Sequence, residues 1–352
     1  MKRKKILVIK PDDIGDAIIL IPFLKELRRQ RPEHFIFYAS RAKTLSLIRS
    51  WPWVDKALPY STDNREYSLL GKIYVVFTSG IWILQNRFLF CDEVYVMRLH
   101  ASFPEKILAQ LTFARKRIGW PNFGWPGLYT RPISKQIGLH ESEQFCTALP
   151  QAVKKYPDCH FPCTTEESNS TKHQFPLGSR ILAIGANKTV DEHRNWPISY
   201  YAEFIEYLHQ QNPDLFFVLL GGKDDISSND EIIKSTGDHV YSSAGKCTLL
   251  ESYALLQRCY MFVGNDSGPM HLAAAARLPV IEISGYPVGA DISHANSPER
   301  FGPFGVPFRV CRPPKTATGD KTRNKNRIQE VSVSKVIDSY EDLCKDLGKV
   351  HV

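Results

Sequence analysis

The sequence predicts an α/β fold of two domains, each built on a parallel sheet. Its 352 residues suffice for two domains of roughly 100–200 residues each. In both halves, short apolar runs typical of strands alternate with stretches of helical periodicity, which is the pattern of successive βα units. Between about residues 151 and 179 this periodicity disappears and Pro, Ser, Thr and Lys accumulate, as they do in linkers.

The first half opens with a strand, a loop and a helix. The strand is the apolar run Ile6–Ile9, and helix-like spacing then extends from Gly15 to Arg29. Pro22 falls within that stretch and should kink the helix or mark its early boundary, because proline lacks an amide donor and crowds the preceding turn. Three further apolar runs are predicted as strands: His34–Tyr38, Ile73–Phe77 and Glu93–Met97.

The second half repeats the alternation. Its predicted strands are Arg180–Ile184, Leu215–Leu220, Met261–Gly264 and Pro279–Ser284, and its predicted helices are Pro197–Gln210, Leu249–Arg258, Gly268–Arg277 and Val331–Leu347. We therefore expect an N-terminal Rossmann-like domain at 1–160, a linker at 161–179 and a second Rossmann-like domain at 180–330. The segment 331–352 is expected to be a helix, for which packing back on the N-terminal domain is one option.

Lysine and arginine outnumber the acidic residues by 45 to 37, which gives a net charge of +8. This favours an anionic partner such as a nucleotide, a phosphorylated glycan or a membrane surface. Basic stretches at Lys2–Lys5 and Arg312–Arg327 suggest peripheral contact with a membrane, although a solvated loop is the simpler interpretation of the second. No zinc-finger spacing, RNA-binding aromatic run or dominant basic helix occurs, so we expect no nucleic acid.

Eight irregularly spaced cysteines are typical of reduced thiols rather than of a disulfide framework. Cys159 and Cys163 could form half of a metal site, but no second cysteine pair completes it, so no metal is expected. Charged residues interrupt the N-terminal apolar run, and no export signal is predicted. The longest apolar run, Ala17–Leu24, falls far short of the ~20 residues of a spanning helix. We expect a cytoplasmic protein, at most peripheral on a membrane.

The strongest local motif runs from Asn265 to Ala276, where a strand leads into a helix of small residues. The start of a helix presents amide groups without intrahelical partners and the positive end of the helix dipole, which together suit a diphosphate. Gly268 would allow close backbone approach, Asp266 could bind hydroxyl groups and His271 could donate to a phosphate. Alternatively, Asp266 or Ser267 caps the helix and His271 is an internal histidine.

Three other polar residues are candidates for a site. Asp16 follows the first strand, at the sheet edge where ligands bind in such folds, and could act as a general base or simply cap a helix. Arg194 precedes a helix, where a cation is unfavourable unless an anion such as a leaving diphosphate lies beside it. An exposed arginine is the alternative. Asp224, in the turn Gly221–Asp225, could reach a ribose or serve the turn alone.

Several phosphate-binding motifs are absent from the sequence. It contains no G-x-G-x-x-G fingerprint and no G-x-x-x-x-G-K-[ST] loop, which weakens the interpretations as a dehydrogenase or an NTPase. No D-x-D pair occurs either, so a carboxylate clamp for a divalent metal is not evident. Phosphates would have to be bound by cations and backbone amides.

The longest motifs are Ile6–Ala17 with Pro22, and Val263–Ala275. Shorter stretches follow a consistent order along the chain: Arg117–Trp120, His140-Glu141, Arg194–Pro197, Gly221-Gly222, and Gly245-Lys246 before Leu249. Together these motifs resemble glycosyltransferase family 9, whose members include the lipopolysaccharide heptosyltransferases. The resemblance covers both halves of the chain.

The resemblance implies a GT-B fold with two facing Rossmann-like domains, the first binding mainly the acceptor and the second mainly a nucleotide sugar. It also implies inversion at the anomeric carbon without an obligatory metal, and no other cofactor. The roles that it implies are as follows: Asp16 is the candidate base, Arg194 contacts the diphosphate, and the Asp266-Ser267-Gly268 turn with His271 holds the donor.

The sequence departs from the family pattern at two places. The stretch 185–193 is less glycine-rich and more charged than usual, and within it Lys188 is a further candidate for donor binding. Asp12 and Asp13 stand where small hydroxyl residues are common, so Asp13 rivals Asp16 as the base.

The resemblance implies an inverting, metal-independent glycosyltransferase that moves a heptose from ADP-heptose to a lipopolysaccharide core or related glycan. One alternative keeps the fold but uses another nucleotide sugar, for O-antigen or capsule synthesis. Another is a catalytically silent relative that binds a glycan or a nucleotide. The expected partners are the nucleotide sugar and the glycan acceptor, with peripheral contact at the cytoplasmic face of the inner membrane.

Overall fold

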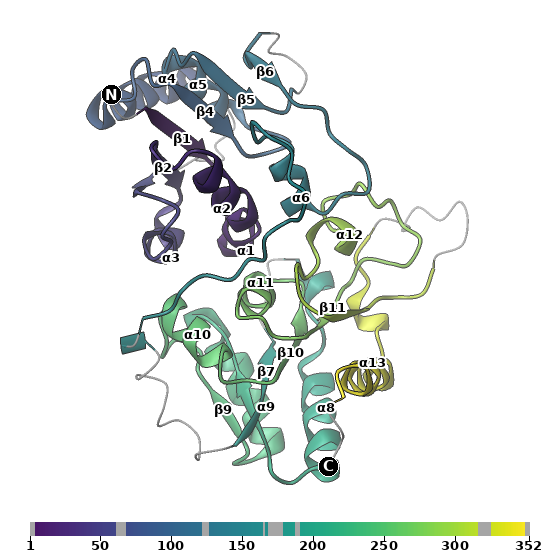
Figure 1. The fold of residues 1–352 in the computed structure, drawn as a ribbon. Coiled ribbons are helices and arrows are strands. Elements are labelled where there is room, and N and C mark those ends of the chain that lie inside the picture. The colour runs from purple at the N-terminus through teal and green to yellow at the C-terminus, as the bar shows by residue number, and fades with distance from the viewer. Residues whose placement is uncertain are drawn as a thin grey trace. The chain divides into compact units, whose positions relative to one another are not determined.

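The computed structural model describes residues 4–60, 68–121, 127–164, 166–167, 179–186, 191–315 and 325–348. The chain forms two compact units (Figure 1). Unit 1 comprises Met1–Gln136 and Glu141–Pro157, and unit 2 comprises Ile137–His140 and Asp158–Val352. Most of the expected linker at 161–179 lies outside the described residues.

Among its described residues, unit 1 contains a six-stranded parallel sheet in the order β3-β2-β1-β4-β5-β6. The strands are β1 (Lys5–Ile9), β2 (Phe35–Ser40), β3 (Lys56–Pro59), β4 (Glu93–Val96), β5 (Lys116–Gly119) and β6 (Arg131–Pro132). The helices are α1 (Ile14–Ile18), α2 (Ile21–Gln30), α3 (Leu45–Arg49), α4 (Leu69–Asn86), α5 (Phe103–Leu111) and α6 (Glu141–Cys146).

Unit 2 contains a second six-stranded parallel sheet in its described part, in the order β12-β11-β10-β7-β8-β9. The strands are β7 (Arg180–Gly185), β8 (Leu215–Leu219), β9 (Val240–Ser242), β10 (Met261–Asn265), β11 (Val280–Ile283) and β12 (Phe308–Cys311). The helices are α8 (Ile198–Gln211), α9 (Ile226–Thr236), α10 (Leu249–Leu256), α11 (Gly268–Ala275), α12 (Pro298–Phe301) and α13 (Val333–Asp346), and short 3-10 turns include η2 (Glu192–Arg194) and η3 (Lys223–Asp225).

The two sheets share one topology. In each, the first strand of the unit lies between the second and the fourth: β1 between β2 and β4, and β7 between β8 and β10. This is the strand order of a Rossmann-like sheet, which confirms the predicted α/β class. The order reverses between β1 and β4 and between β7 and β10, and ligands of such sheets bind at the carboxyl ends of these strand pairs. Each unit therefore has one place where a site is expected.

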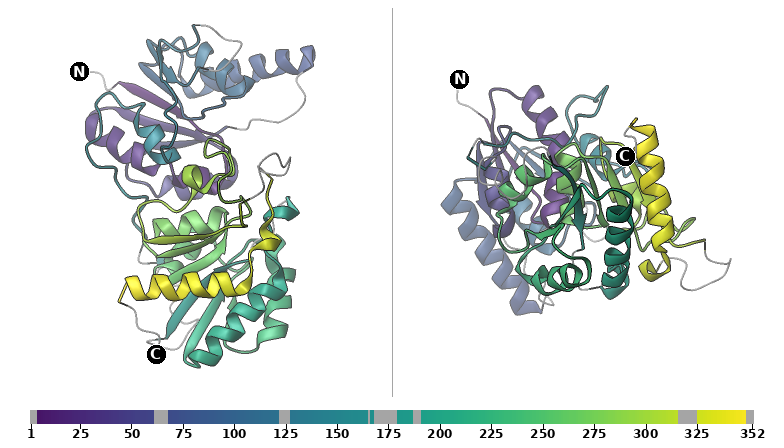
Figure 2. Two further views of the ribbon diagram at one scale, coloured as in Figure 1. Left: turned by 90° about the vertical axis from the view of Figure 1, so that its right-hand side faces the viewer. Right: turned by 90° about the horizontal axis from the view of Figure 1, so that it is seen from below.

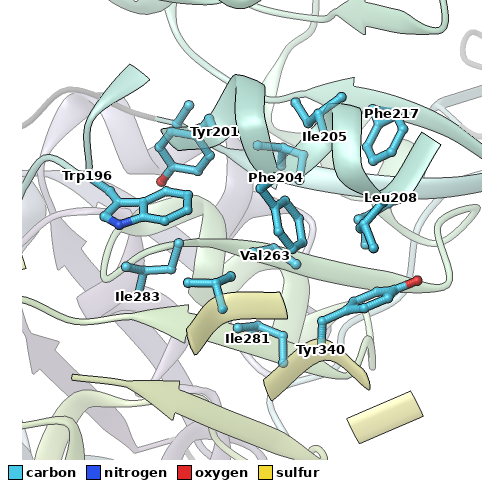
Figure 3. Packing of buried hydrophobic residues seen from close by; sticks show 14 of the residues in the cluster. Trp196, Tyr201, Phe204, Ile205, Leu208, Phe217, Val263, Ile281, Ile283 and Tyr340 are labelled. Carbon is cyan, nitrogen blue, oxygen red and sulfur yellow. The ribbon is translucent and has the colours of Figure 1, made fainter. Parts of the chain in front are cut away.

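The core of unit 2 joins its last helix to its sheet. Side chains of α8 such as Phe204 pack with Val263 and Ile281 of the sheet and with Tyr340 of α13 (Figure 3). The indole of Trp196 donates to the carbonyl of Val331 at 2.8 Å. The apolar face of α13 is thus buried within unit 2. The option that this helix also packs back on the N-terminal domain stays a prediction.

One predicted strand is wrong. The run Ile73–Phe77 lies inside the helix α4, because a short apolar run fits a strand and a segment of a helix equally well. The Ser68 hydroxyl accepts a hydrogen bond from the Gly71 amide at 3.1 Å and so caps the start of this helix. The other predicted strands coincide with β1, β2, β4, β7, β8, β10 and β11 to within two residues. Pro22 lies in the first turn of α2 and marks a helix boundary, as predicted.

Candidate functional site

The carboxyl ends of β1 and β4 carry a cluster of paired charges. Lys10, which follows β1 directly, is buried, and its Nζ lies 2.9 Å from Asp12 Oδ2 and 3.4 Å from Asp16 Oδ1. Arg98, two residues after β4, lies 3.4 Å from Asp12 Oδ1 and donates to Glu105 at 2.8 Å. Ion pairs therefore join the two loops at the point where the strand order reverses.

The buried pair in this cluster stays charged. Burial alone would lower the pKa of Lys10, but the charges of Asp12 and Asp16 outweigh it and raise that pKa. Burial alone would raise the pKa of Asp12, but Lys10 and Arg98 outweigh it and lower that pKa. Because Asp12 is both buried and held by two cations, it is suited to fixing Lys10 rather than to accepting a proton.

The other two carboxylates of this loop differ in their partners. Asp13 is the N-cap residue of α1, although its side chain makes no capping hydrogen bond, and Asp16 lies inside the helix. The alternative that Asp16 caps the helix is therefore wrong. Asp13 Oδ1 lies 2.8 Å from Arg41 and 2.6 Å from Lys43. The Asp16 side chain is 39% exposed, and its described ion pair is the longer contact with Lys10. Asp16 thus has fewer and longer ion-pair contacts than Asp13.

The carboxyl ends of β7 and β10 bring a second pair together. The guanidinium of Arg194 donates to Asp266 Oδ2 at 2.8 Å and to the Asp266 carbonyl at 3.1 Å. Arg194 ends the turn η2 rather than preceding a helix immediately, since α8 begins after the N-cap residue Pro197. The side chain is neither buried nor a free surface arginine, so the alternative of an exposed arginine is wrong. The pair places a cation beside the start of α11.

The start of α11 leaves one amide, that of Gly268, without an intrahelical acceptor, because the amides of Met270 and His271 already donate to the Ser267 carbonyl. Ser267 is the N-cap residue but its side chain makes no capping hydrogen bond, and its hydroxyl donates to the Asn265 carbonyl at 3.1 Å. The Asp266 carboxylate is taken by Arg194, so the alternative that either side chain caps the helix is wrong. The amide of Gly268, as the first helical residue, has no intrahelical acceptor, and Pro269 has no amide hydrogen.

Close backbone packing explains a glycine that precedes this turn. A Cβ atom on Gly264 would lie 2.6 Å from the carbonyl oxygen of Gly185, its partner across the strands. Next to it, Asn265 is buried and accepts a hydrogen bond from the Tyr201 hydroxyl at 2.8 Å. These contacts fix the end of β10, and hence the place from which Asp266 and the start of α11 project.

His271 lies buried in α11. Burial lowers the pKa of His140 to about 4. The nearby charge of His271 is a smaller cause in the same direction. The His140 ring lies 3.0 Å from the Gly302 carbonyl through Nε2 and stacks on Phe304. His140 is therefore neutral at pH 7 and anchors its segment in unit 2.

Within the described residues, no group of three or more His, Cys, Asp or Glu side chains is placed to hold a metal ion. All eight cysteines are free thiols, and Cys159 is buried while Cys163 is partly exposed. No described helix combines the length and the apolar character that crossing a membrane requires.

A sequence profile of glycosyltransferase family 9 (heptosyltransferase) matches residues 95–324. The chain belongs to glycosyltransferase family 9. It is 32% identical over 281 residues to lipopolysaccharide heptosyltransferase 3 of Escherichia coli, a match that covers 77% of this chain and 80% of that protein. It is 25% identical over 331 residues to lipopolysaccharide heptosyltransferase 2 of E. coli K12, covering 88% of each chain. The chain is accordingly a glycosyltransferase, as predicted.

Solved structures of the same family share the fold of this family 9 glycosyltransferase. E. coli ADP-heptose lps heptosyltransferase II superimposes with a TM-score of 0.74 at 21% identity, covering 98% of this chain and 99% of that chain. A family 9 glycosyltransferase from Veillonella parvula gives a TM-score of 0.77 at 20% identity, covering 97% of each. The predicted GT-B fold is thereby confirmed.

One buried acid of the family 9 glycosyltransferase was missed by sequence reasoning. Glu282 lies in β11, directly across from Gly264 of β10, and is fully buried. Burial, with Asp266 and Glu299 close by, raises its pKa well above the usual value, although Arg312 opposes the shift. Burial thus favours the protonated form of this carboxyl. The sequence feature that could have identified Glu282 is an acidic residue in the middle of the apolar run Val280–Ile283.

Two further predicted site residues, Asp224 and Lys188, remain to be located in the structure. Asp225 is buried and accepts a hydrogen bond from the Gly222 amide at 2.9 Å, so this acid holds the turn after β8. Its neighbour Asp224 is exposed and stays a predicted donor contact. Lys188 lies outside the described residues. Sequence reasoning also missed Lys10, although a lysine directly after a buried strand was the available signal.

Proposed function

We propose that this glycosyltransferase transfers a heptose from ADP-heptose to a lipopolysaccharide core or a closely related glycan. The observation that carries the proposal is the 32% identity to a lipopolysaccharide heptosyltransferase across 77% of this chain. The paired charges after β7 and β10 support it, because they are compatible with an anionic donor.

On the donor side, Arg194 is proposed to contact the diphosphate and to offset the charge that develops as ADP leaves. Asp266 orients the guanidinium through a 2.8 Å ion pair. The Gly268 amide and His271 are proposed to bind phosphate oxygens beside Ser267, where the start of a helix favours an anion.

On the acceptor side, Asp16 is proposed to be the general base. It takes the proton of the acceptor hydroxyl while that oxygen forms a bond to the anomeric carbon. The bond between the anomeric carbon and the diphosphate oxygen breaks at the same time, and ADP leaves with the electron pair. Attack on the face opposite the leaving group inverts the anomeric configuration.

We propose that transfer needs no metal ion. The sequence has no D-x-D pair, and Arg194 can supply positive charge to the leaving group in place of a divalent ion. Activity should therefore persist after dialysis against a chelator. Loss of activity in chelator that returns with a single divalent ion would contradict this part of the proposal.

We also propose that the enzyme works at the cytoplasmic face of the inner membrane, in peripheral contact with it. The named acceptor of its relatives is a lipopolysaccharide or lipooligosaccharide, and the net charge of +8 suits an anionic surface.

A panel of nucleotide sugars tests the proposal. The purified protein is incubated with a heptose-deficient lipopolysaccharide core and one donor at a time, and products are identified by mass spectrometry. We expect a mass gain of one heptose with ADP-heptose. A gain with a different sugar nucleotide alone would favour the O-antigen or capsule alternative, and nucleotide binding without any product would favour the silent relative.

A further inference from the structure

Helix α4 exposes an unusual amount of apolar surface. Six of its large apolar side chains are more than half exposed: Leu69, Leu70, Ile73, Tyr74, Phe77 and Leu84. Only Ser79 and Ile83 among its described residues are buried. Soluble proteins rarely leave so many neighbouring apolar side chains in water, and such patches mark surfaces that bind something.

The exposed side chains form one continuous face. At 100° per residue, the six positions fall within an arc of about 140° around the helix axis. The opposite face carries the buried residues and packs beside α5 (Figure 1). Both views in Figure 2 show α4 running along the outside of unit 1. The apolar face is therefore a second, outward face and not the side that completes the unit's core.

Two exposed phenylalanines follow the ends of α4 and α5. Phe90 and Phe113 are both exposed, and their rings lie 5.8 Å apart. Their φ angles are +58° and +48°, in the left-handed region that is costly for bulky residues. The Phe90 amide donates to the Thr112 carbonyl at 2.6 Å and helps to hold this conformation. The backbone is thus strained at a place where two aromatic rings point into water.

The charged residues of α4 and of the segment that follows it are basic as far as Cys91, and Asp92 comes next. From Ser68 to Cys91 the sequence contains no acidic residue, and its charged residues are Lys72 and Arg87. Arg87 is exposed directly after α4, and Arg115 is exposed two residues after Phe113. Arg87 and Arg115, the exposed cations next to α4 and to Phe113 in the chain, are called the basic rim here. Exposed apolar side chains with such cations match the interface of an anionic lipid bilayer, which offers hydrocarbon beneath negative headgroups.

We propose that the exposed face of α4, together with Phe90 and Phe113, docks on an anionic phospholipid bilayer. This docking surface rests on the membrane contact in the proposed function, and it moves that contact from the basic stretches Lys2–Lys5 and Arg312–Arg327 to the α4 side of unit 1. The apolar face inserts at the headgroup boundary, while Arg87 and Arg115 pair with lipid phosphates.

The charges favour a bilayer over a second copy of the chain. In a twofold dimer built on this face, the basic rims around Arg87 and Arg115 would meet rims of the same sign, which is unfavourable. An anionic bilayer instead neutralises the whole rim.

Co-sedimentation with vesicles tests the docking surface. The full chain is mixed, without any sugar nucleotide, with phosphatidylglycerol–phosphatidylethanolamine vesicles and with phosphatidylcholine vesicles. The variant Ile73→Gln/Phe77→Gln removes two apolar side chains and keeps residues that favour a helix. The matched control is Ile137→Gln, because Ile137 is 76% exposed in unit 2. Thermal unfolding of each variant shows whether it is folded.

We expect the wild type and Ile137→Gln to bind the anionic vesicles, and Ile73→Gln/Phe77→Gln to bind at least tenfold more weakly. Arg87→Gln/Arg115→Gln should weaken binding at low salt and have little effect at high salt. Equal binding by the wild type and the α4 variant would overturn the inference. So would a dimer in sedimentation velocity that the α4 variant abolishes, with no vesicle binding. Transfer to a lipid-free core oligosaccharide is measured separately, so failure of the proposed function leaves the docking result unaffected.

Discussion

Arg194 donates to both the carboxylate and the carbonyl of Asp266, at 2.8 and 3.1 Å, although the two residues are 72 positions apart in the sequence. The pair joins the segment after β7 to the segment after β10. It places a cation of fixed orientation next to the start of α11, where an anionic donor is expected.

Replacing Arg194 should therefore impair catalysis more than folding. We expect Arg194→Ala to lower kcat by about 10²–10³, because a donor aimed at the developing charge is lost. Arg194→Lys should recover only part of the rate, since an ammonium group cannot reproduce the fork of the guanidinium. The matched control is Arg277→Ala, which breaks an exposed pair with Asp158. An Arg194→Ala enzyme within threefold of the wild-type kcat would exclude the proposed role.

Glu282→Gln should remove a pH-dependent loss of stability. Because the folded-state pKa of Glu282 is raised by burial, the folded protein holds a proton that the unfolded chain releases above about pH 4.3. Relative to the variant, the wild type thus loses about 1.4 kcal/mol of unfolding free energy for each pH unit. The loss begins near about pH 4.3 and ends at the folded-state pKa of Glu282. Urea unfolding at pH 5, 6 and 7 measures this. A constant difference between the two proteins across these pH values would contradict the raised pKa of Glu282.

Lys10→Met should destabilise the protein strongly. It removes the cation closest to the buried Asp12 and leaves the more distant Arg98 and Arg41, and breaking a buried pair costs about 3–5 kcal/mol. Adding Asp12→Asn should restore part of the loss, because no buried charge is then unpaired. The control Lys116→Met breaks a more exposed pair and should cost less than about 1 kcal/mol. Chemical denaturation at pH 7 measures all three, and a loss for Lys10→Met no larger than the control would refute the structural role.

Gly264→Ala should destabilise unit 2 by about 1–3 kcal/mol, because its Cβ would meet the Gly185 carbonyl at 2.6 Å. The matched control is Gly80→Ala in α4, where a Cβ would meet no atom within 4 Å. That change should be neutral or stabilising by up to about 1 kcal/mol, since alanine favours a helix. Thermal unfolding measures both. If the two variants unfold alike, the backbone contact does not explain the glycine.

The sequence predicts those parts of the fold that local patterns determine. The strand, turn and helix around Asp16 and those around Asp266 could be predicted, because apolar runs and helix starts are contiguous in sequence. The strands β3 (Lys-Ala-Leu-Pro) and β6 (Arg-Pro) contain too few apolar residues to be recognised as strands. The run Ile73–Phe77 was misassigned because its apolar character comes from an exposed helical face rather than from a buried strand.

The partners within the site could not be predicted. Lys10 and Arg98 share Asp12 as an ion-pair partner, and Glu282 lies near Asp266 because β10 and β11 are neighbouring strands. These relationships depend on strand order, which local sequence does not encode. The residue types at the strand ends could nevertheless be recognised, and this is why Asp16, Arg194 and Asp266 were among the predicted site residues.

The most direct test of the account compares Asp16→Asn with Asp13→Asn in the transfer of heptose from ADP-heptose to a truncated core acceptor. We expect Asp16→Asn to lower kcat by about 10²–10⁴, as loss of a general base does. Asp13→Asn should stay within several-fold of the wild type, because Asp13 is held by Arg41 and Lys43. A large loss in Asp13→Asn with near-normal turnover in Asp16→Asn, or no transfer from ADP-heptose by the wild type, would contradict the account.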